Sequence, residues 1–178
     1  MSSSRVSLHI PGRSDAEEYL AAVTASAEFH RPWVFPASDH RRYLAYVRTR
    51  RRHDQWGVLV RATEDGRLVG VINVNNIVRG GMQSGALGYD AFADRARQGL
   101  MTEALRQMID VAFDSSKLGL HRLEANIQPT NDASTRLVKR LGFRHEGFSP
   151  ALLFIDGAWR DHDRWAITTD LWRGTDHR

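Results

Sequence analysis

The sequence predicts an α+β fold: a mixed, mostly antiparallel central sheet flanked by helices in a three-layer α/β arrangement. Short runs rich in β-branched and aromatic residues alternate with segments whose apolar residues recur every three or four positions. The expected order of elements is β-α-α-β-β-β-α-β-α-β-β. The 178-residue chain shows no internal repeat or low-complexity segment, so we expect a single domain over residues 1–178.

The composition excludes several classes of function. The chain has no cysteine, which rules out disulfides, thiolate metal sites and a cysteine nucleophile. Its histidines show no spacing typical of a metal site. No apolar run is long enough to cross a membrane, and the first residues lack an apolar stretch of signal-peptide length. We therefore expect a cytoplasmic protein without a membrane partner.

Arginine dominates the basic residues: it supplies 23 of the 25, and the formal net charge is +4. This modest excess suggests a polyanionic ligand or partner. The densest run is Arg48–Arg52, for which two interpretations remain open. It contacts a ribosome, or it is a solvated helix end whose cations complement the C-terminal dipole. Beyond such a ribosome contact, we expect no direct binding of nucleic acid.

The N-terminal elements follow from alternation and capping. Val6–Ile10 alternates apolar and polar residues, which predicts a strand. Ser14 and Glu17 form an S-x-x-E capping box, which predicts a helix running to about Ala27. A second helix is expected after the cap at Ser38-Asp39, ending at the arginine run.

An aromatic segment, Phe29–Pro36, separates these two helices. Its two prolines predict a non-helical loop. Phe29, Trp33 and Phe35 either pack over the edge of the core or line a substrate entrance, since exposed aromatic loops usually bind something.

Three strands are expected next, forming an antiparallel meander. Trp56–Ala62 and Leu68–Asn75 are apolar and β-branched, and Asp65-Gly66 between them is a strong hairpin signal. A glycine-rich turn, Val78–Gly85, then leads to the strand Ala86–Phe92.

The segment Arg95–Asp114 predicts the central helix, about four turns long. One buried stripe consists of the apolar residues Met101, Leu105, Met108 and Ala112. The helix opens from Arg97-Gln98-Gly99, and its first N–H groups lack partners within it. Strand, basic glycine-containing turn and helix together predict an anion-binding site, most plausibly for phosphate. The alternative is an ordinary strand-to-helix turn.

The C-terminal part predicts one helix among four strands. The expected strands, bounded by proline, glycine and aspartate turns, are Leu120–Gln128, Phe143–Phe148, Leu152–Ile155 and Trp159–Thr168. Asn131 caps the helix, which Gly142 ends. The portion from Ala86 to Gln128 should be a right-handed parallel crossover.

This order and several short sequences resemble the GCN5-related N-acetyltransferase superfamily. Within it, the chain is similar to the ribosomal-protein N-terminal acetyltransferases RimJ and RimL, especially RimJ. The likeness covers nearly the whole chain, and its sequences are Leu87-Gly88-Tyr89, Gln98–Ala104, Asn131-x-x-Ser134, Leu141-Gly142-Phe143, Ile155–Asp161, Val78-Arg79-Gly80 and the Arg31-Pro32-Trp33 loop.

The resemblance implies acetyl-coenzyme A as donor. It implies that N–H groups of Arg97, Gln98, Gly99, Leu100, Met101 and Thr102 hold the pyrophosphate, and that Leu87, Gly88 and Tyr89 pair with the pantetheine arm. It further implies that Asn131 hydrogen-bonds the cofactor and that Ser134 donates to the leaving thiolate. A plain helix N-cap pair is the alternative for Asn131 and Ser134. The phosphate-loop pattern is looser than usual, with Ala96 and Met101 flanking Gly99.

The catalytic base is where the chain departs from the RimL pattern. The position of the glutamate proposed as base in RimL-type enzymes is Leu153 here, so the resemblance supplies no base. Glu124 is our first candidate, with a structural ion pair as the alternative; Asp90 is next, and His30 and His121 follow. Alternation puts Asn126 on the same strand face as Glu124.

The resemblance implies an N-acetyltransferase acting on the α-amine of a protein N-terminus, perhaps of a ribosomal protein, by direct transfer in a ternary complex. Candidate substrate-binding residues are Phe29, Arg31, Trp33 and Asn126. Two other functions remain open: acetylation of a small-molecule amine, and a non-catalytic module that binds coenzyme A or RNA.

Overall fold

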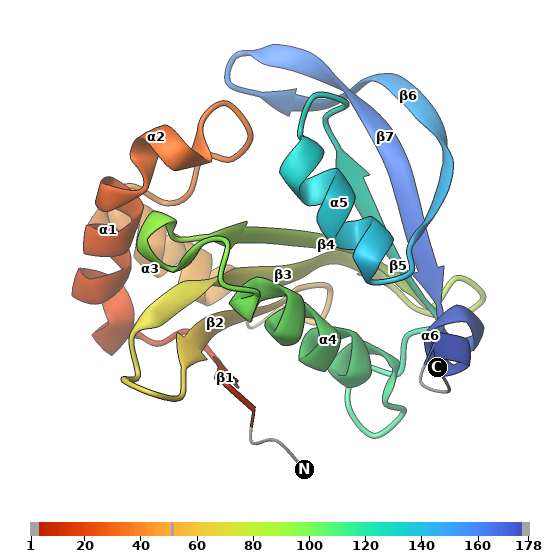
Figure 1. Ribbon diagram of the computed structural model, residues 1–178, viewed down its shortest axis with the longest axis horizontal. Coiled ribbons are helices and arrows are strands. Elements are labelled where there is room, and N and C mark those ends of the chain that lie inside the picture. Colours follow the sequence, from red (N-terminus) through yellow and green to blue (C-terminus); the bar gives the residue numbers. More distant parts are fainter. Residues whose placement is uncertain (1–3, 51, 176–178) are drawn as a thin grey trace. The chain divides into compact units, whose positions relative to one another are not determined.

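The computed structural model describes residues 4–50 and 52–175, which group into two compact units. The first unit contains residues up to 75 and residues 88–108, and the second contains residues 76–87 and those from 109 onward. Figure 1 shows the elements. Their bounds are β1 (Val6–His9), η1 (Arg13–Asp15), α1 (Ala16–Ala25), α2 (Ala27–His30), α3 (His40–Thr49), β2 (Trp56–Ala62), β3 (Leu68–Val78), β4 (Ser84–Ala91), η2 (Ala93–Arg95), α4 (Leu100–Phe113), β5 (Arg122–Ile127), α5 (Asp132–Arg140), β6 (Arg144–Ile155), β7 (Ala158–Thr168) and α6 (Thr169–Thr175).

The strands confirm the predicted fold class. Hydrogen bonding runs in the order β1-β2-β3-β4-β5-β7-β6. The β1/β2, β2/β3, β5/β7 and β6/β7 pairs are antiparallel, and β4/β5 is parallel, as a strand–helix–strand crossover requires. The sheet is therefore mixed and mostly antiparallel.

The first unit has an aromatic core between its helices and strands. Tyr43 is fully buried and donates its hydroxyl to the carbonyl of Gly12 at 2.8 Å. The ring of Tyr19 lies 4.6 Å from that of Tyr43 and edge-on to Phe92 at 6.1 Å. These contacts hold α1 and α3 against Phe92, the residue that follows β4.

The start of α1 differs from the sequence prediction. The capping box of Ser14 and Glu17 does not form, because a 3-10 turn, η1, precedes the helix and makes Asp15 the N-cap. The carboxylate of Asp15 instead accepts the N–H of Gly12 at 2.8 Å and pairs with Arg61 at 2.8 Å. A local hydrogen bond and a tertiary ion pair thus both engage Asp15 where this helix begins.

The aromatic segment is also partly helical, contrary to prediction. Phe29 and His30 belong to the short helix α2, which ends before Arg31-Pro32. The buried ring of His30 anchors this turn, since its Nε2 lies 2.8 Å from the carbonyl oxygen of Ala91. The prolines therefore end the helix without preventing it.

The central helix α4 confirms the predicted stripe. Leu105, Met108 and Ala112 are fully buried and Met101 is 8% exposed. Its last turns belong to the second unit, where Asp110 accepts the indole N–H of Trp172 at 2.7 Å. Trp172 lies in α6, a helix that the sequence reading missed.

The second unit is built on β5, β7 and β6, with α5 packed on β5 (Figure 1). The two expected strands at 143–148 and 152–155 are one strand, β6, with a register shift between Ser149 and Leu153. Ala151 lies at the shift with φ of 47°, and its N–H donates to Asp161 at 2.8 Å. The bulge allows the pairing with β7 to resume.

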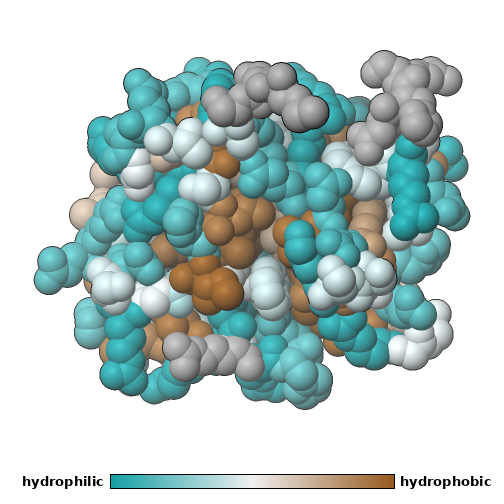
Figure 2. All heavy atoms as spheres, turned by 90° about the horizontal axis from the view of Figure 1, so that it is seen from below, coloured by the Kyte–Doolittle hydropathy of each residue, from teal (hydrophilic) through white to brown (hydrophobic). Residues whose placement is uncertain are grey.

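No described helix is both long enough and apolar enough to span a bilayer. On the face drawn in Figure 2, hydrophilic side chains cover most of the surface, and hydrophobic residues show in limited areas between them.

Candidate functional site

The N-terminus of α4 presents a row of backbone donors. Arg97 and Gly99 both have positive φ, 64° and 79°. Within residues 4–50 and 52–175, the backbone N–H groups from Arg97 through Thr102 have no hydrogen-bond partner. Glu103 is the first residue whose N–H bonds back, to the carbonyl of Gly99 at 3.2 Å. Unpaired donors at a helix N-terminus favour a bound anion, so these residues fit a pyrophosphate.

Charged side chains surround this turn. Arg97 is exposed, and Arg5 places a guanidinium nitrogen 3.5 Å from where a Cβ on Gly99 would lie. Arg5 also donates to the carbonyl of Gln98 at 3.3 Å and pairs with Glu103 at 3.0 Å. Although partial burial opposes ionisation, hydrogen bonds from Ser4 and Arg5 lower the pKa of Glu103. The Arg5–Glu103 pair therefore supports the turn, and the helix N-terminus and Arg97 supply its positive potential.

The strand β4 carries the residues predicted to pair with pantetheine. Its parallel ladder with β5 covers Ser84, Gly85 and Ala86, and ends immediately before Leu87. Leu87 belongs to the second unit, and Gly88 and Tyr89 to the first. The nearest atom to a Cβ built on Gly88 is the Nδ2 of Asn75, at 3.6 Å, so this position is loosely packed.

Asn131 and Ser134 lie together in the second unit. The Oδ1 of Asn131 accepts the backbone N–H of Ser134 at 3.1 Å, so the helix cap that the sequence analysis left as an alternative is formed. This bond uses the main chain of Ser134. Cap and catalytic donor are therefore compatible roles, and the donor role of Ser134 stays a prediction.

Glu124 forms ion pairs with arginines. Its Oε1 lies 2.9 Å from the Nε of Arg122, and its Oε2 lies 3.9 Å from a guanidinium nitrogen of Arg164. Arg122 in turn pairs with Glu146, which raises the pKa of Arg122 and lowers that of Glu146. The geometry favours the structural ion pair for Glu124.

Asn126, next on the same face of β5, has a different environment. Its Oδ1 is buried and lacks a hydrogen-bond partner among the residues that the structure describes. A buried acceptor without a donor is costly. The role of Asn126 in binding substrate stays a prediction.

The predicted substrate-binding loop lies in the first unit. Phe29 is 44% exposed, Arg31 is exposed and Trp33 is half-buried. The N–H of Trp33 donates to the carbonyl of His30 at 2.9 Å, so the buried histidine organises this turn.

A polar cluster beneath α3 was missed by the sequence reading. Arg50 donates to Asn75 at 2.8 Å, to Asn73 at 3.2 Å and to Gln55 at 2.9 Å, and lies over the ring of Tyr46. Burial lowers the pKa of this guanidinium. A signal was present: Asn73-Val74-Asn75 alternates two amides with a buried valine on an otherwise apolar strand.

Asp90 and His30 form a second buried group. The Oδ2 of Asp90 lies 3.9 Å from the Nε2 of His30, and the two side chains are 14% and 3% exposed. Burial raises the pKa of the Asp90 carboxyl to about 7. Burial also lowers the pKa of His30, with the hydrogen bond to Ala91 opposing it. From the sequence alone, both residues rank behind Glu124 as candidate bases.

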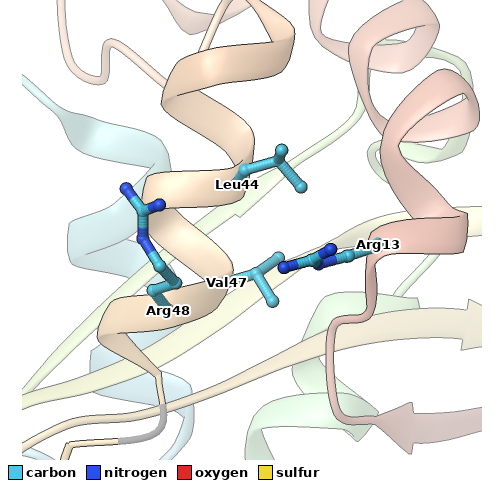
Figure 3. Close-up of a pocket in the computed structure, with 4 residues that line it drawn as sticks. All are labelled: Arg13, Leu44, Val47 and Arg48. Carbon is cyan, nitrogen blue, oxygen red and sulfur yellow. The ribbon is translucent and has the colours of Figure 1, made fainter.

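A small pocket of about 140 Å³ lies elsewhere in the first unit, lined by Arg13, Leu44, Val47 and Arg48 (Figure 3). It contains none of the predicted cofactor residues, and its volume is too small for a coenzyme. The arginines of the neighbouring run have different environments. Arg48 is exposed, Arg50 is hydrogen-bonded within the polar cluster beneath α3, and Arg52 pairs with Asp54 at 3.2 Å. Arg51 lies outside the described residues.

Comparison with known proteins identifies the family. The model "Acetyltransferase (GNAT) domain" matches residues 5–144. The Bacillus subtilis (strain 168) protein named "Probable N-acetyltransferase YjcK" is 32% identical over 164 residues, covering 86% of this chain and 88% of that protein. The Escherichia coli (strain K12) "[Ribosomal protein uS5]-alanine N-acetyltransferase" is 39% identical over 109 residues, 61% of this chain and 55% of that one.

The solved structure of Mycobacterium smegmatis RimJ in complex with CoA-disulfide superimposes with a TM-score of 0.84 at 29% identity, covering 93% of this chain and 82% of that one. Fold and sequence therefore agree along most of the chain. The protein belongs to the GNAT family of acetyltransferases and has relatives among the RimJ and RimL ribosomal-protein acetyltransferases.

Proposed function

We propose that this enzyme transfers the acetyl group of acetyl-CoA to the α-amine of a protein N-terminus, with a ribosomal protein as the type of acceptor. Acetyl-CoA is the donor in this fold. The observation that carries the assignment is the row of unpaired N–H groups from Arg97 through Thr102. The acceptor is supported by the identity to the uS5-alanine N-acetyltransferase, which spans 55% of that protein.

The chain's own residues divide the work of a direct transfer in a ternary complex. Backbone N–H groups at the start of α4 hold the pyrophosphate, and the β4 backbone at Leu87, Gly88 and Tyr89 pairs with the pantetheine arm. Asn131 orients the cofactor, and the Ser134 hydroxyl donates to the departing thiolate. Holding the amine beside the thioester supplies much of the rate, because it replaces a bimolecular encounter.

An α-amine suits a site with few ionisable groups. Its pKa is near 8, compared with about 10.4 for lysine. About one α-amine in ten is therefore already neutral at pH 7. Such an acceptor needs only modest help to lose its proton. Phe29, Arg31 and the half-buried Trp33 are proposed to receive the residues that follow the amine.

A ribosomal acceptor would place the enzyme in the cytoplasm. The exposed Arg48 would then contribute to a ribosome contact. Arg50 would not, because its guanidinium already donates hydrogen bonds to Asn73, Asn75 and Gln55. Arg48→Ala should weaken co-sedimentation with ribosomes and leave acetylation of a short peptide unchanged. If wild type and Arg48→Ala co-sediment equally with ribosomes, this contact is contradicted.

The acceptor is tested with two peptides that differ only at their amines. One has a free α-amine and no lysine; the other has a blocked α-amine and one lysine. The proposal requires acetyl transfer to the first peptide and little to the second. Equal rates would refute α-amine specificity, and faster transfer to small amines would identify a small-molecule enzyme. Salt-sensitive RNA binding without acetyl transfer would identify a non-catalytic module.

A further inference from the structure

One face of β3 and β4 in the first unit is polar where it lies beneath α3. Asn73 accepts the hydroxyl of Tyr46 at 2.9 Å, and the Nδ2 of Asn75 is the nearest atom to a Cβ on Gly88. Because side chains alternate along a strand, Asp90 lies on the same face as Gly88, two residues or roughly 7 Å further along. This face therefore brings a carboxylate close to the strand position proposed to bind pantetheine.

Asp90 is a buried carboxylate that no described cation neutralises. Its Oδ2 is buried and has no hydrogen-bond partner within residues 4–50 and 52–175. The titratable groups that face it are Tyr19 from α1, His30 from α2 and Tyr46 from α3. The His30 Nε2 is already hydrogen-bonded to the carbonyl of Ala91, so that nitrogen carries a proton and the neutral ring offers Asp90 no full charge.

The nearby arginine does not fill this role. Arg50 directs its donors to Asn73, Asn75, Gln55, Thr49 and the carbonyl of Trp56. An ionised carboxylate left unpaired in a buried site is strongly disfavoured, so it either takes up a proton or meets a cation. A ligand ammonium satisfies this requirement, and the tyrosine rings around Asp90 favour a cation as well.

We propose that Asp90 receives the acceptor's α-ammonium group and removes its proton before attack on the thioester. This inference rests on the proposed acetyl transfer and names the residue that activates the amine. His30 is a positioning residue, since it ties α2 to the β4 backbone beside Asp90.

The protons balance without another reactant. The Asp90 carboxylate takes one proton from the ammonium, leaving a neutral amine. The amine nitrogen forms a bond to the thioester carbonyl carbon, and the carbon–sulfur bond then breaks. The second nitrogen proton ends on the departing sulfur, which leaves as a thiol, and Asp90 releases its proton to solvent. A carboxyl pKa of about 7 suits this exchange with an amine of pKa near 8, because the two values are close.

Asp90 fits this role better than Glu124. Both carboxylate oxygens of Glu124 are directed at arginines, whereas Asp90 has only a histidine nitrogen at 3.9 Å. Carboxylate oxygens that already face guanidinium groups are less available to receive an ammonium group. The structure therefore reverses the order in which the sequence analysis ranked these two residues.

The test compares Asp90→Asn with Glu17→Gln, which removes an exposed carboxylate from α1 and changes the net charge equally. With acetyl-CoA and a free α-amine peptide, kcat/KM at pH 7 should fall about 10²- to 10³-fold in Asp90→Asn and stay near wild type in Glu17→Gln. The affinity for coenzyme A, measured by calorimetry, should be equal in all three proteins. When kcat/KM is plotted against pH, wild type should show an acidic limb near pH 7. This limb should be changed in Asp90→Asn.

A second acceptor separates proton removal from a structural role. A peptide whose α-amine has a pKa of about 6 is largely neutral at pH 7, so its acetylation by Asp90→Asn should approach the wild-type rate. An equal loss with both peptides, or no loss with either, would overturn the proposal. If Asp90→Asn does not fold, the Asp90 carboxyl of the wild-type protein can be titrated by ¹³C NMR with and without the acceptor peptide. A titration near pH 7 that the peptide does not shift would also overturn the proposal.

Failure of the acceptor assignment gives a different result. If the wild-type enzyme acetylates a small amine and no peptide, the proposed protein acceptor is wrong. The same variants assayed with that amine would still test Asp90.

Discussion

Gly70 on β3 lies so close to Asp90 on β4 that a Cβ at residue 70 would come within 2.3 Å of the carbonyl oxygen of Asp90. The same Cβ would lie 2.8 Å from the Sδ of Met101, on α4. This glycine allows β3 to approach both the strand that carries the proposed proton acceptor and the helix whose N-terminus is proposed to bind the anion. Its small size connects the two parts of the site in the first unit.

Gly70→Ala should therefore destabilise the protein by roughly 1–3 kcal/mol, because a backbone atom has to move to accommodate the methyl group. Urea unfolding measures the change. Gly81→Ala is the control, since a Cβ there would meet nothing within 4 Å. Equal unfolding free energies for the two variants would contradict the close approach.

Gly99→Ala should weaken binding of coenzyme A about tenfold or more, because φ of 79° disfavours any side chain and relaxation would turn the N–H groups away from the anion. Gly66→Ala provides the control, with φ of 72° and no role in binding. Both variants should lose about 1 kcal/mol of stability. Calorimetric titration that finds the same affinity for both would remove the N-terminus of α4 from the cofactor site.

Ser134→Ala should lower kcat about 10²-fold with little change in the KM for acetyl-CoA, because the hydroxyl acts on sulfur only as the thioester breaks. The cap of α5 should survive, since Asn131 accepts the backbone N–H of residue 134. Steady-state kinetics and a melting curve measure the two effects. Unchanged kcat would leave Ser134 with a capping role alone.

The stability difference between wild type and Asp90→Asn should depend on pH. The folded-state pKa of Asp90, about 7, lies above the ordinary value of 3.8, so burial favours the neutral acid. Its contribution to stability is complete below about pH 4 and is lost as pH rises through 7. From pH 5 to pH 8, wild type should lose roughly 1–3 kcal/mol relative to Asp90→Asn.

Urea unfolding of both proteins at the two pH values measures this relative loss. Because other carboxylates titrate equally in the two proteins, the difference isolates Asp90. A difference that stays constant with pH would show that the carboxyl does not titrate in this range.

Much of the architecture was predictable because it depends on local patterns. The spacing of apolar residues every three or four positions located α4, and strand alternation located β1 to β5. The predicted turn at Asp156-Gly157 joins β6 to β7, with positive φ values of 50° and 73°. The unpaired N–H groups from Arg97 through Thr102 were also predictable, since they follow from where a helix begins. The sequence resemblance to GNAT acetyltransferases was confirmed by the family match.

The tertiary structure decided which carboxylate is paired and which is not. Glu124 and Asp90 are each the single acidic residue of their strands, β5 and β4. Strand alternation already places Arg122 beside Glu124, whereas folding brings Arg164 to Glu124 and brings Tyr19, Tyr46 and His30 to Asp90. Long-range packing likewise pairs Asp15, at the start of α1, with Arg61. Local sequence specifies where helices and strands form, but a side chain's charge and proton affinity depend on neighbours that are distant along the chain, and only packing brings these together.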